Sequence, residues 1–275
     1  QQTRCFTIAF GSNWEYGDTF TYKLEIDKKH WSIDSDTTNN ISYPCGIFRD
    51  VVGANVKVSD RDSVITPLDR RLQYYIQFQN DGDEIVDYVT IIDTLDPNLN
   101  LGSFSLDGAS SNYTYYLINN VLYVMFNNMN LQPKSVNEAG SIGSVSYSIA
   151  ANNSLVSETM IYNQASVYFD FALPFQTNIQ ANVLKSPIEI LSINDTILCV
   201  GKEVTINYKT WYKALGGNDF IVEMSDENED FTTPTIVHAI RKDSTEGTLI
   251  FTLPNTMKVG TYKFRITGTS PSAYT

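Results

Sequence analysis

The chain has 275 residues, of which 42% are hydrophobic and 12% aromatic, enough for two domains that each bury a core. Its net charge is −12, from 19 Lys+Arg against 31 Asp+Glu. This balance offers no basic patch for nucleic acid or for an anionic membrane surface. No run of about 18 apolar residues is present, so we expect neither a nucleic-acid partner nor direct membrane insertion. The start Gln1–Cys5 carries no signal-peptide pattern and reads as mature or trimmed.

The first 60 residues contain two strand-like runs, "CFTIAF" and "DTFTYKLEI". We interpret residues 1–60 as the end of a preceding module or as strands added to the first sandwich. We expect these strands to pair within their own chain, and pairing with a neighbouring copy is the main alternative.

The chain has three cysteines, Cys5, Cys45 and Cys199, and none forms a CxxC pair. Their spacing therefore favours neither zinc nor redox chemistry. We predict a disulfide between Cys5 and Cys45, closing a loop of about 40 residues, which leaves Cys199 alone.

Residues 61–184 show strict alternation of apolar and polar residues, the pattern of half-buried strands. In the first run Leu72, Tyr74, Ile76 and Phe78 share one face. The acidic turn Asn80–Asp83 follows, and we predict that it is the tip of a hairpin. Further alternating runs in this unit hold Val145, Tyr147 and Ile149, and Ile161, Ala165, Val167 and Phe169. The same pattern recurs after residue 184, in the runs with Val204, Ile206 and Tyr208 and with Tyr262, Phe264 and Ile266.

Residues 185–275 form a second unit, which opens at Pro187 and has the size of an immunoglobulin-like domain. No stretch in the chain repeats its apolar residues at helical spacing. We therefore predict an all-β fold of tandem antiparallel β-sandwiches, immunoglobulin-like, with under about 10% helix. The run "GTYKFRITGT" carries Lys263 and Arg265, and we expect it to be a charge-guarded edge strand.

The stretch "LQYYIQFQNDGDEIVDYVTIIDTLDPNLNLGSFSLDGASS", with "NEAGSIGSVSYSI" and "IYNQASVYFDFALPFQTN", resembles the conserved-repeat β-sandwich of large secreted surface proteins of Bacteroidota. The resemblance covers about residues 60–183. The upstream "VVGANVKVSDRD" departs from the usual acidic segment of that family. The second unit resembles the immunoglobulin-like repeats of such proteins through "LCVGKEVTINY" and "GGNDFIVEMSDENEDF".

The resemblance implies a part of a larger protein exported by type IX secretion and located outside the cell or on its surface. It implies a non-enzymatic structural or adhesive module, such as a stalk, fibre or adhesin segment, whose partners are other surface modules or copies of itself. The alternative is a carbohydrate- or ligand-binding accessory region of a secreted enzyme. A carbohydrate-binding role would use exposed aromatic residues, for which Tyr113, Tyr115, Tyr116 and Tyr123 are the candidates, although we favour core and cross-strand packing as their role.

The resemblance also implies O-glycosylation at Asp-Ser/Thr pairs. The candidates are Thr37, Ser63, Thr196, Ser244 and Thr94, the last being doubtful because a buried strand position would exclude a glycan.

Residues with catalytic potential are sparse. His30 and His238 are far apart in sequence and lie in no metal-binding spacing. The nearby carboxylates Asp93 and Asp96 are too close along the chain to predict the facing pair of a glycosidase. We therefore expect no enzyme and no cofactor, with calcium as the one exception to test.

Calcium prefers clustered carboxylate and carbonyl oxygens. The sequence offers such clusters in three places, at Asp34 and Asp36, at Asp81, Asp83 and Asp87, and at Asp226 and Asp230. Asp also favours tight turns for purely structural reasons, and none of the clusters has the spacing of an EF-hand loop.

Overall fold

The computed structural model describes residues 19–21, 24–25, 41–42, 45–47, 55–61, 63–170, 172–212 and 217–275. In these ranges the regular elements are strands, apart from the short 3-10 turn Ala139–Ser141. The all-β prediction is confirmed. No helix in the described ranges is long and apolar enough to cross a membrane.

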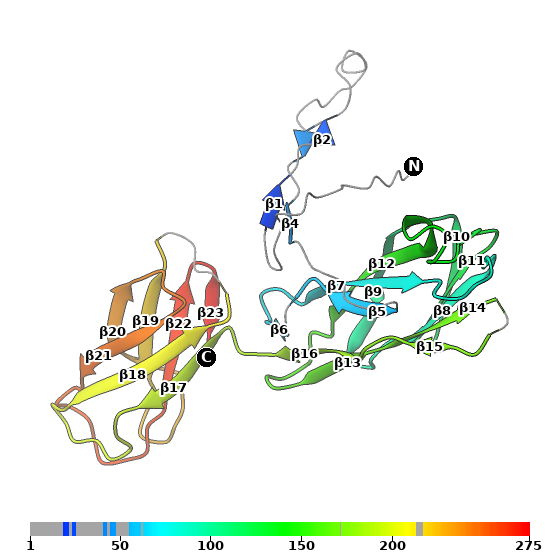
Figure 1. Cartoon of the computed structure of the whole chain (residues 1–275). Helices are drawn as coiled ribbons and strands as arrows, with labels where there is room; N and C mark the ends of the chain where they lie inside the picture. Colours follow the sequence, from blue (N-terminus) through cyan, green and yellow to red (C-terminus); the bar gives the residue numbers. More distant parts are fainter. Residues whose placement is uncertain are drawn as a thin grey trace, which may run out of the picture.

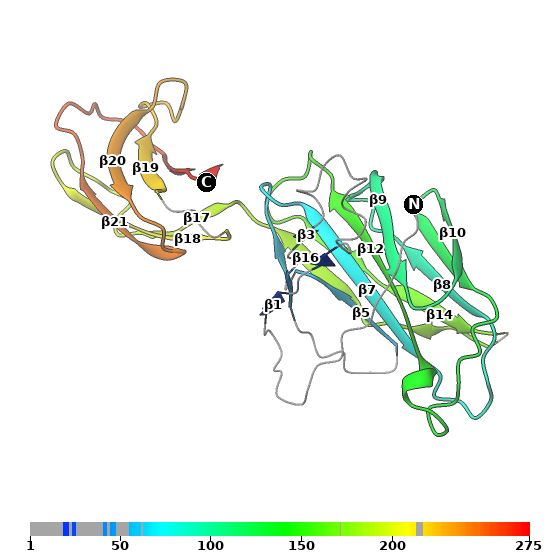
Figure 2. The same cartoon turned by 90° about the horizontal axis from the view of Figure 1, so that it is seen from above.

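The first unit is a sandwich whose two main sheets have the strand orders β5-β7-β12-β9 and β10-β11-β8-β14-β15 (Figure 2). A smaller sheet, β13-β16-β6, continues it at the end where the chain leaves. Its strands are β5 (Val56–Ser59), β6 (Val64–Ile65), β7 (Arg71–Gln79), β8 (Val89–Thr94), β9 (Leu99–Ala109), β10 (Tyr113–Ile118), β11 (Val121–Phe126), β12 (Ile142–Ala151), β13 (Met160–Asn163), β14 (Ala165–Phe169), β15 (Phe175–Gln176) and β16 (Gln180–Leu184).

Alternation in the sequence sets which residues of this unit are buried. On β7 the residues Leu72, Tyr74, Ile76 and Phe78 all have 0% exposure. They meet the inward faces of β8, β12 and β14 in one core cluster that runs from Ile65 to Leu184. The predicted inward faces of β7, β12 and β14 are therefore confirmed.

The hairpin predicted around Asn80–Asp83 is wrong. Strands β7 and β8 belong to different sheets, so residues 80–88 cross from one layer of the sandwich to the other. Asn80 holds the start of this crossover, because its side-chain amide donates to the carbonyl oxygens of Glu84 (2.8 Å) and Leu131 (3.0 Å). The residues of this turn do end strand β7. The segment that follows connects two sheets rather than two neighbouring strands.

The second unit has a three-stranded sheet, β17-β18-β21, and a four-stranded sheet, β20-β19-β22-β23 (Figure 1). A separate cluster of buried apolar residues, including Val204, Ile206, Tyr208 and Ile266, fills the space between them. Its strands are β17 (Ile188–Ile193), β18 (Glu203–Thr210), β19 (Asp219–Met224), β20 (Thr235–Arg241), β21 (Glu246–Thr252), β22 (Phe264–Thr269) and β23 (Ser272–Tyr274).

The run with Lys263 and Arg265 is not an edge strand. Its strand, β22, lies between β19 and β23 and pairs with both. Arg265 instead forms an ion pair across the sheet with Glu223 on β19 (Nε–Oε2, 2.5 Å). The short β23 takes the edge position, because the chain turns back after Thr269 and adds three residues to the sheet.

In the first 60 residues, β1 (Thr19–Thr21) pairs with β4 (Cys45–Ile47), and β2 (Leu24–Glu25) pairs with β3 (Ile41–Ser42). These pairs lie within the segment itself. Cys5 and the run "CFTIAF" lie outside the described residues, so the disulfide stays a prediction.

The two faces of β8 provide a direct test of the sandwich. Ile91 has 0% exposure, whereas its neighbour Ile92 points outward and is half-buried. Ile91→Ala will lower the free energy of unfolding by about 2–5 kcal/mol because it leaves a cavity between the sheets. The matched control Ile92→Ala will cost less than about 1 kcal/mol. Urea denaturation of both variants checks this, and equal losses would contradict the assignment of faces.

Candidate functional site: a buried lysine between the sheets

A lysine side chain lies in the core of the first unit. Lys57 is on β5 and pairs with Ile76 of β7, so it points to the same inward face as Ile76. Its exposure is 0%, although the neighbouring Val56 and Val58 on the opposite face are half-buried. Lysine is almost never fully buried without a partner, because an unpaired ammonium loses its hydration.

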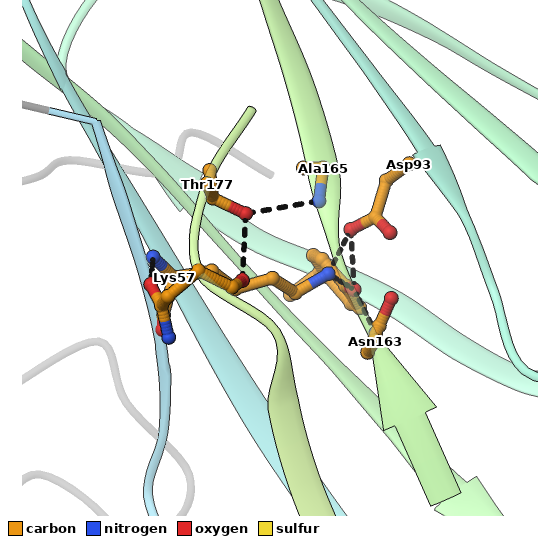
Figure 3. Close-up of polar contacts among 7 residues, drawn as sticks. Lys57, Asp93, Asn163, Ala165 and Thr177 are labelled. Carbon is orange, nitrogen blue, oxygen red and sulfur yellow. Dashed lines mark hydrogen bonds and ion pairs between the residues drawn. The ribbon is translucent and has the colours of Figure 1, made fainter. Parts of the chain in front are cut away.

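Three polar side chains surround the Lys57 amine (Figure 3). The Nζ donates hydrogen bonds to Asp93 Oδ2 and to Tyr147 Oη, the latter at 2.9 Å. The Tyr147 hydroxyl donates to the same Asp93 oxygen at 2.7 Å. Asn163 Nδ2 donates to Tyr147 Oη at 2.8 Å. The amine and the carboxamide therefore contact one shared hydroxyl oxygen.

The cluster spans the thickness of the sandwich. Lys57 and Tyr147 come from β5 and β12 in one sheet, and Asp93 comes from β8 in the facing sheet. Asn163 is the last residue of β13, where the chain passes into β14 and changes its pairing partner from β16 to β8. Asp93 and Asn163 have exposures of 0% and 2%.

Aromatic rings and unpaired oxygens complete the environment. Lys57 Nζ lies 4.8 Å from the ring centroid of Tyr74 and 5.3 Å from that of Tyr147. Within the described residues, Asp93 Oδ1, Asn163 Oδ1 and the Tyr74 hydroxyl are buried with no hydrogen-bond partner. Buried polar atoms without partners are rare and costly. The cluster thus keeps two buried acceptor oxygens, Asp93 Oδ1 and Asn163 Oδ1, without a partner.

Burial changes the acid–base chemistry of these groups. Desolvation lowers the pKa of Lys57 to about 8, even though the negative charge of Asp93 opposes this shift. Desolvation, followed by the charge of Asp93, raises the pKa of Tyr147 well above its ordinary value. A larger fraction of the Lys57 amine is therefore in the neutral form than for a surface lysine, while the Tyr147 hydroxyl keeps its proton.

The backbone of β5 is held in place by the segment that precedes β16. Asn178 accepts a hydrogen bond from Lys57 N and donates one to Lys57 O, both at 2.8 Å. The adjacent Thr177 binds Ala165, with Ala165 N donating to Thr177 Oγ1 at 3.0 Å (Figure 3). These contacts fix both the strand that carries Lys57 and the start of β14, next to Asn163.

Neither Lys57 nor Asn163 belongs to a sequence motif that predicts a functional site. Asp93 and Asn163 both occupy inward positions of an alternating run, beside Ile91 and Ala165. A polar residue at an apolar position was the available signal. Lys57 gave no such signal, because alternation in "NVKVS" places the valines inward, and only its pairing with Ile76 reverses this.

The carboxylates and histidines considered for catalysis lie apart. Asp96 accepts backbone N–H bonds from Asn98 and Tyr162, both at 2.8 Å, so it serves as a turn cap. His238 is half-buried on β20 in the second unit, where its ring stacks on Phe251. His30 lies outside the described residues.

The calcium candidate in the first unit is a set of exposed turn residues, Asp81, Asp83 and Asp87. The candidate at residues 34–36 lies outside the described residues. Lys134 Nζ lies 3.9 Å from Asp81 Oδ1. In the described ranges, no three His, Cys, Asp or Glu side chains form a group that could hold a metal ion.

The calcium candidate in the second unit, at Asp226 and Asp230, is a capped turn. Asp226 Oδ1 accepts the backbone N–H groups of Asn228 (2.9 Å) and Asp230 (2.8 Å), and these bonds lower the pKa of Asp226. Asp230 in turn accepts from the backbone and hydroxyl of Thr232. Turn formation accounts for both carboxylates, and calcium binding stays a prediction.

The glycosylation candidates differ in exposure. Ser63 and Thr196 are exposed, and Thr94 is also exposed at the end of β8, which removes the structural objection to it. Ser244 is half-buried, and its hydroxyl lies 3.1 Å from the Tyr208 hydroxyl. Thr37 lies outside the described residues, and modification at each of these sites stays a prediction.

The tyrosines considered for glycan contact occupy an edge. Strand β10 is at the border of its sheet, and Tyr113, Tyr115 and Tyr116 are 38%, 45% and 54% exposed. Tyr116 pairs with Tyr123 on β11, which continues the outward face of the sheet. The aromatic rings are thus presented at the surface, with Tyr115 also packing on Phe104 (centroids 6.0 Å apart).

Comparison with family models finds one match, which covers less than half of the chain. Residues 54–183 match the model of the family described as domain of unknown function DUF7619. Lys57, Asp93, Tyr147 and Asn163 all lie within this matched range. No curated protein matches the sequence.

Solved structures with similar folds come from bacterial surface proteins. The C-terminal domain of the Streptococcus agalactiae AgI/II polypeptide BspA is 12% identical, with TM-score 0.35, over 80% of this chain and 97% of that one. The collagen-binding domain of a Staphylococcus aureus adhesin is 11% identical, with TM-score 0.32, over 50% and 99%. BcpA, the major pilin subunit of Bacillus cereus, is 15% identical, with TM-score 0.37, over 78% and 57%. At this level of similarity their names say nothing about what this chain binds.

The charge pairing in the cluster is open to a mutational test. Lys57→Met will lower the free energy of unfolding by about 3–5 kcal/mol, because it leaves Asp93 buried without its cation. Adding Asp93→Leu to Lys57→Met will recover a large part of this loss, since it removes the unpaired group. Urea unfolding of the single and double variants measures the difference. A double variant that is less stable than Lys57→Met would contradict the pairing.

Proposed function

We propose that the chain is a non-enzymatic structural module that transmits tension in a large bacterial protein outside the cell. The observation that supports this is the parallel pair between β16, the last strand of the first unit, and β6, which follows its first strand β5. β6, near its start, and β16, at its end, run parallel, with Val64 opposite Val183 and Ile65 opposite Leu184. Val183 N donates to Ser63 O (2.7 Å) and Lys185 N donates to Ile65 O (2.9 Å).

Parallel pairing of β6 with β16 determines how the unit responds to force. When the two ends of the unit are pulled apart, force reaches β6 through the preceding strand β5, and β6 and β16 are then drawn in opposite directions along their own axes. All hydrogen bonds between them are then loaded together, rather than one after another as in a peeled hairpin. In the described part of the second unit, its first and last strands, β17 and β23, pair only with antiparallel neighbours. The first unit is therefore the one suited to resist tension.

The connection between the units is short and held on both sides. Only residues 185–187 separate β16 from β17. Lys185 forms an ion pair with Glu158 of the first unit (Nζ–Oε1, 2.9 Å), and Trp211 N of the second unit donates to Pro187 O (2.9 Å). A linker this short, with a contact to each unit, would restrict how far the two units move relative to each other.

The predicted limits 61–184 and 185–275 fit this function once the start of the first unit moves to include β5, which pairs with β7 in its sheet. The sequence resemblance of about residues 60–183 to Bacteroidota surface proteins supports export by type IX secretion and partners that are other surface modules or copies of the chain. Exposed Ser63, Thr94 and Thr196 would carry the glycans of such a protein.

Single-molecule pulling on the terminal ends tests the proposal. The first unit will unfold at a higher force than the second, because its parallel strands β6 and β16 are loaded in shear. Val183→Pro removes the N–H that binds Ser63 O and will lower the first unit's unfolding force, while the second unit serves as the internal control. A first unit that yields before the second in the unsubstituted protein would overturn the proposal.

A second candidate function, glycan binding, rests on the outward face of the sheet β10-β11-β8-β14-β15. Its outward positions, deduced from strand pairing, are all uncharged: Thr114, Tyr116, Ile118, Val121, Tyr123, Met125, Thr90, Ile92, Thr94, Ser166, Tyr168 and Gln176. Aromatic rings with hydroxyl and amide groups suit a neutral polysaccharide, whereas an acidic or basic ligand would find no charge partner here.

Affinity electrophoresis in neutral polysaccharides tests this candidate. If the face binds, Tyr116→Ala will reduce the retardation of the protein at least several-fold, because it removes an exposed ring from the face. Tyr162→Ala is the matched control, since Tyr162 is similarly exposed (53%) but lies on β13 in another sheet. Equal migration with and without every polysaccharide in a broad panel would exclude the candidate.

A further inference from the structure

We propose that Lys57 and Asn163 become joined by an intramolecular amide bond between Lys57 Nζ and Asn163 Cγ, with Asp93 transferring the protons. The bond would form inside the folded first unit, without a cofactor or an external enzyme. This inference rests on the geometry of the cluster and does not depend on the proposed mechanical function (Figure 3).

Lys57 has the properties of a nucleophile. Its amine is fully buried, and desolvation shifts it toward the neutral form, whose lone pair is free to attack. The hydrogen bond to Asp93 offers a direct route for the surplus proton. A surface lysine has neither feature, because water keeps it charged.

Asn163 has the properties of the acceptor. Its Nδ2 contacts the same Tyr147 hydroxyl oxygen that Lys57 Nζ contacts, at 2.8 and 2.9 Å. The amine and the carboxamide therefore lie on either side of one hydroxyl, and the reaction requires the amine to move past this hydroxyl to Cγ. The carbonyl oxygen of Asn163 is buried and unpaired, so it is open to a proton from Asp93.

The alternative acceptor is Asp93 itself. A bond from Lys57 to Asp93 would remove the one carboxyl group that is hydrogen-bonded within the cluster, and no second acid in those contacts would then carry protons. Asp93 also keeps Oδ1 free while Oδ2 receives bonds from Lys57 and Tyr147. This arrangement suits a group that gives and takes protons.

The reaction balances as an exchange of one amide for another. A proton moves from the Lys57 ammonium to Asp93, and the neutral amine attacks Asn163 Cγ while Asp93 protonates Oδ1. Asp93 then moves a proton from Nζ to Nδ2, the Cγ–Nδ2 bond breaks, and Oδ1 returns its proton as the carbonyl reforms. Ammonia leaves, takes up the remaining proton as ammonium, and Asp93 is restored as a carboxylate.

Peptide mapping of the purified, folded protein tests the proposal. A protease digest will contain one branched peptide that joins the residues around Lys57 to those around Asn163, with the mass of the two peptides minus one ammonia molecule. Trypsin will not cleave after Lys57. Mapping is preferred to intact mass alone, because an amino-terminal glutamine such as Gln1 also loses ammonia when it cyclises.

Two variants isolate the chemistry. Asp93→Asn keeps the shape of the side chain but removes the acid, and it will abolish the branched peptide. Asn182→Ala is the matched control, because Asn182 is also fully buried in the first unit, yet its amide contacts Ser59 rather than the cluster. This variant will retain the branched peptide. A branched peptide in the digest of Asp93→Asn would contradict the proposed role of Asp93 in proton transfer.

The wild-type map decides the proposal even where a variant fails to fold. Separate, unbranched peptides that contain free Lys57 and intact Asn163 would overturn it. A branched peptide that has lost water and joins Lys57 to Asp93 would also overturn it, because the acceptor would then be the carboxyl group. A low unfolding force of the first unit would contradict the proposed mechanical function but not the amide bond, which peptide mapping tests separately. The two proposals can therefore fail independently.

Discussion

A lysine amine buried between two sheets is the constraint that organises the first unit. An ammonium without water or a counter-charge would cost several kcal/mol, so its partners must be present and correctly placed. Those partners come from β8, β12 and the junction of β13 with β14, in both layers of the sandwich. A register shift of one residue in any of these strands would turn the partner outward and leave the amine unsatisfied. The polar cluster therefore specifies strand register more strictly than the apolar side chains around it, which tolerate rearrangement.

Much of this architecture was predictable from period-two patterns. The inward faces of β7 and β12 follow directly from alternation, and the all-β class follows from the absence of helical spacing. The same rule places Asp93 after Val89 and Ile91, and Asn163 between Ile161 and Ala165, at core positions. A buried carboxylate and a buried amide in one domain require a buried polar partner. The positions of Asp93 and Asn163 in the core could therefore be predicted from the sequence.

The remaining features depend on pairing between distant strands. Nothing local shows that β7 and β8 lie in different sheets, because a short acidic turn serves a crossover as well as a hairpin. Lys57 sits among valines that alternation would bury, and its inward direction is fixed by pairing opposite Ile76 some distance along the chain. The role of β22 as an inner strand depends likewise on the three residues that β23 adds. Long-range register is set by the whole sandwich, and single-sequence patterns do not contain it.

The positions of the cluster residues along the chain connect the chemistry to the mechanics. Lys57 lies on the first strand of the sandwich, and Asn163 lies one strand pairing away from β16, the strand by which the chain leaves. Force arriving at the start of the unit meets Lys57 before it reaches most of the core. A covalent bond to Asn163 would pass that force across the sandwich to β13, and from there to β16, so that the chain between residues 57 and 163 could not be extended. The same bond would shorten the largest extension of the unfolded chain and reduce its conformational entropy. Hydrogen bonds between parallel strands resist force only until they break, whereas an amide bond within the core keeps most of the unit closed after they have broken.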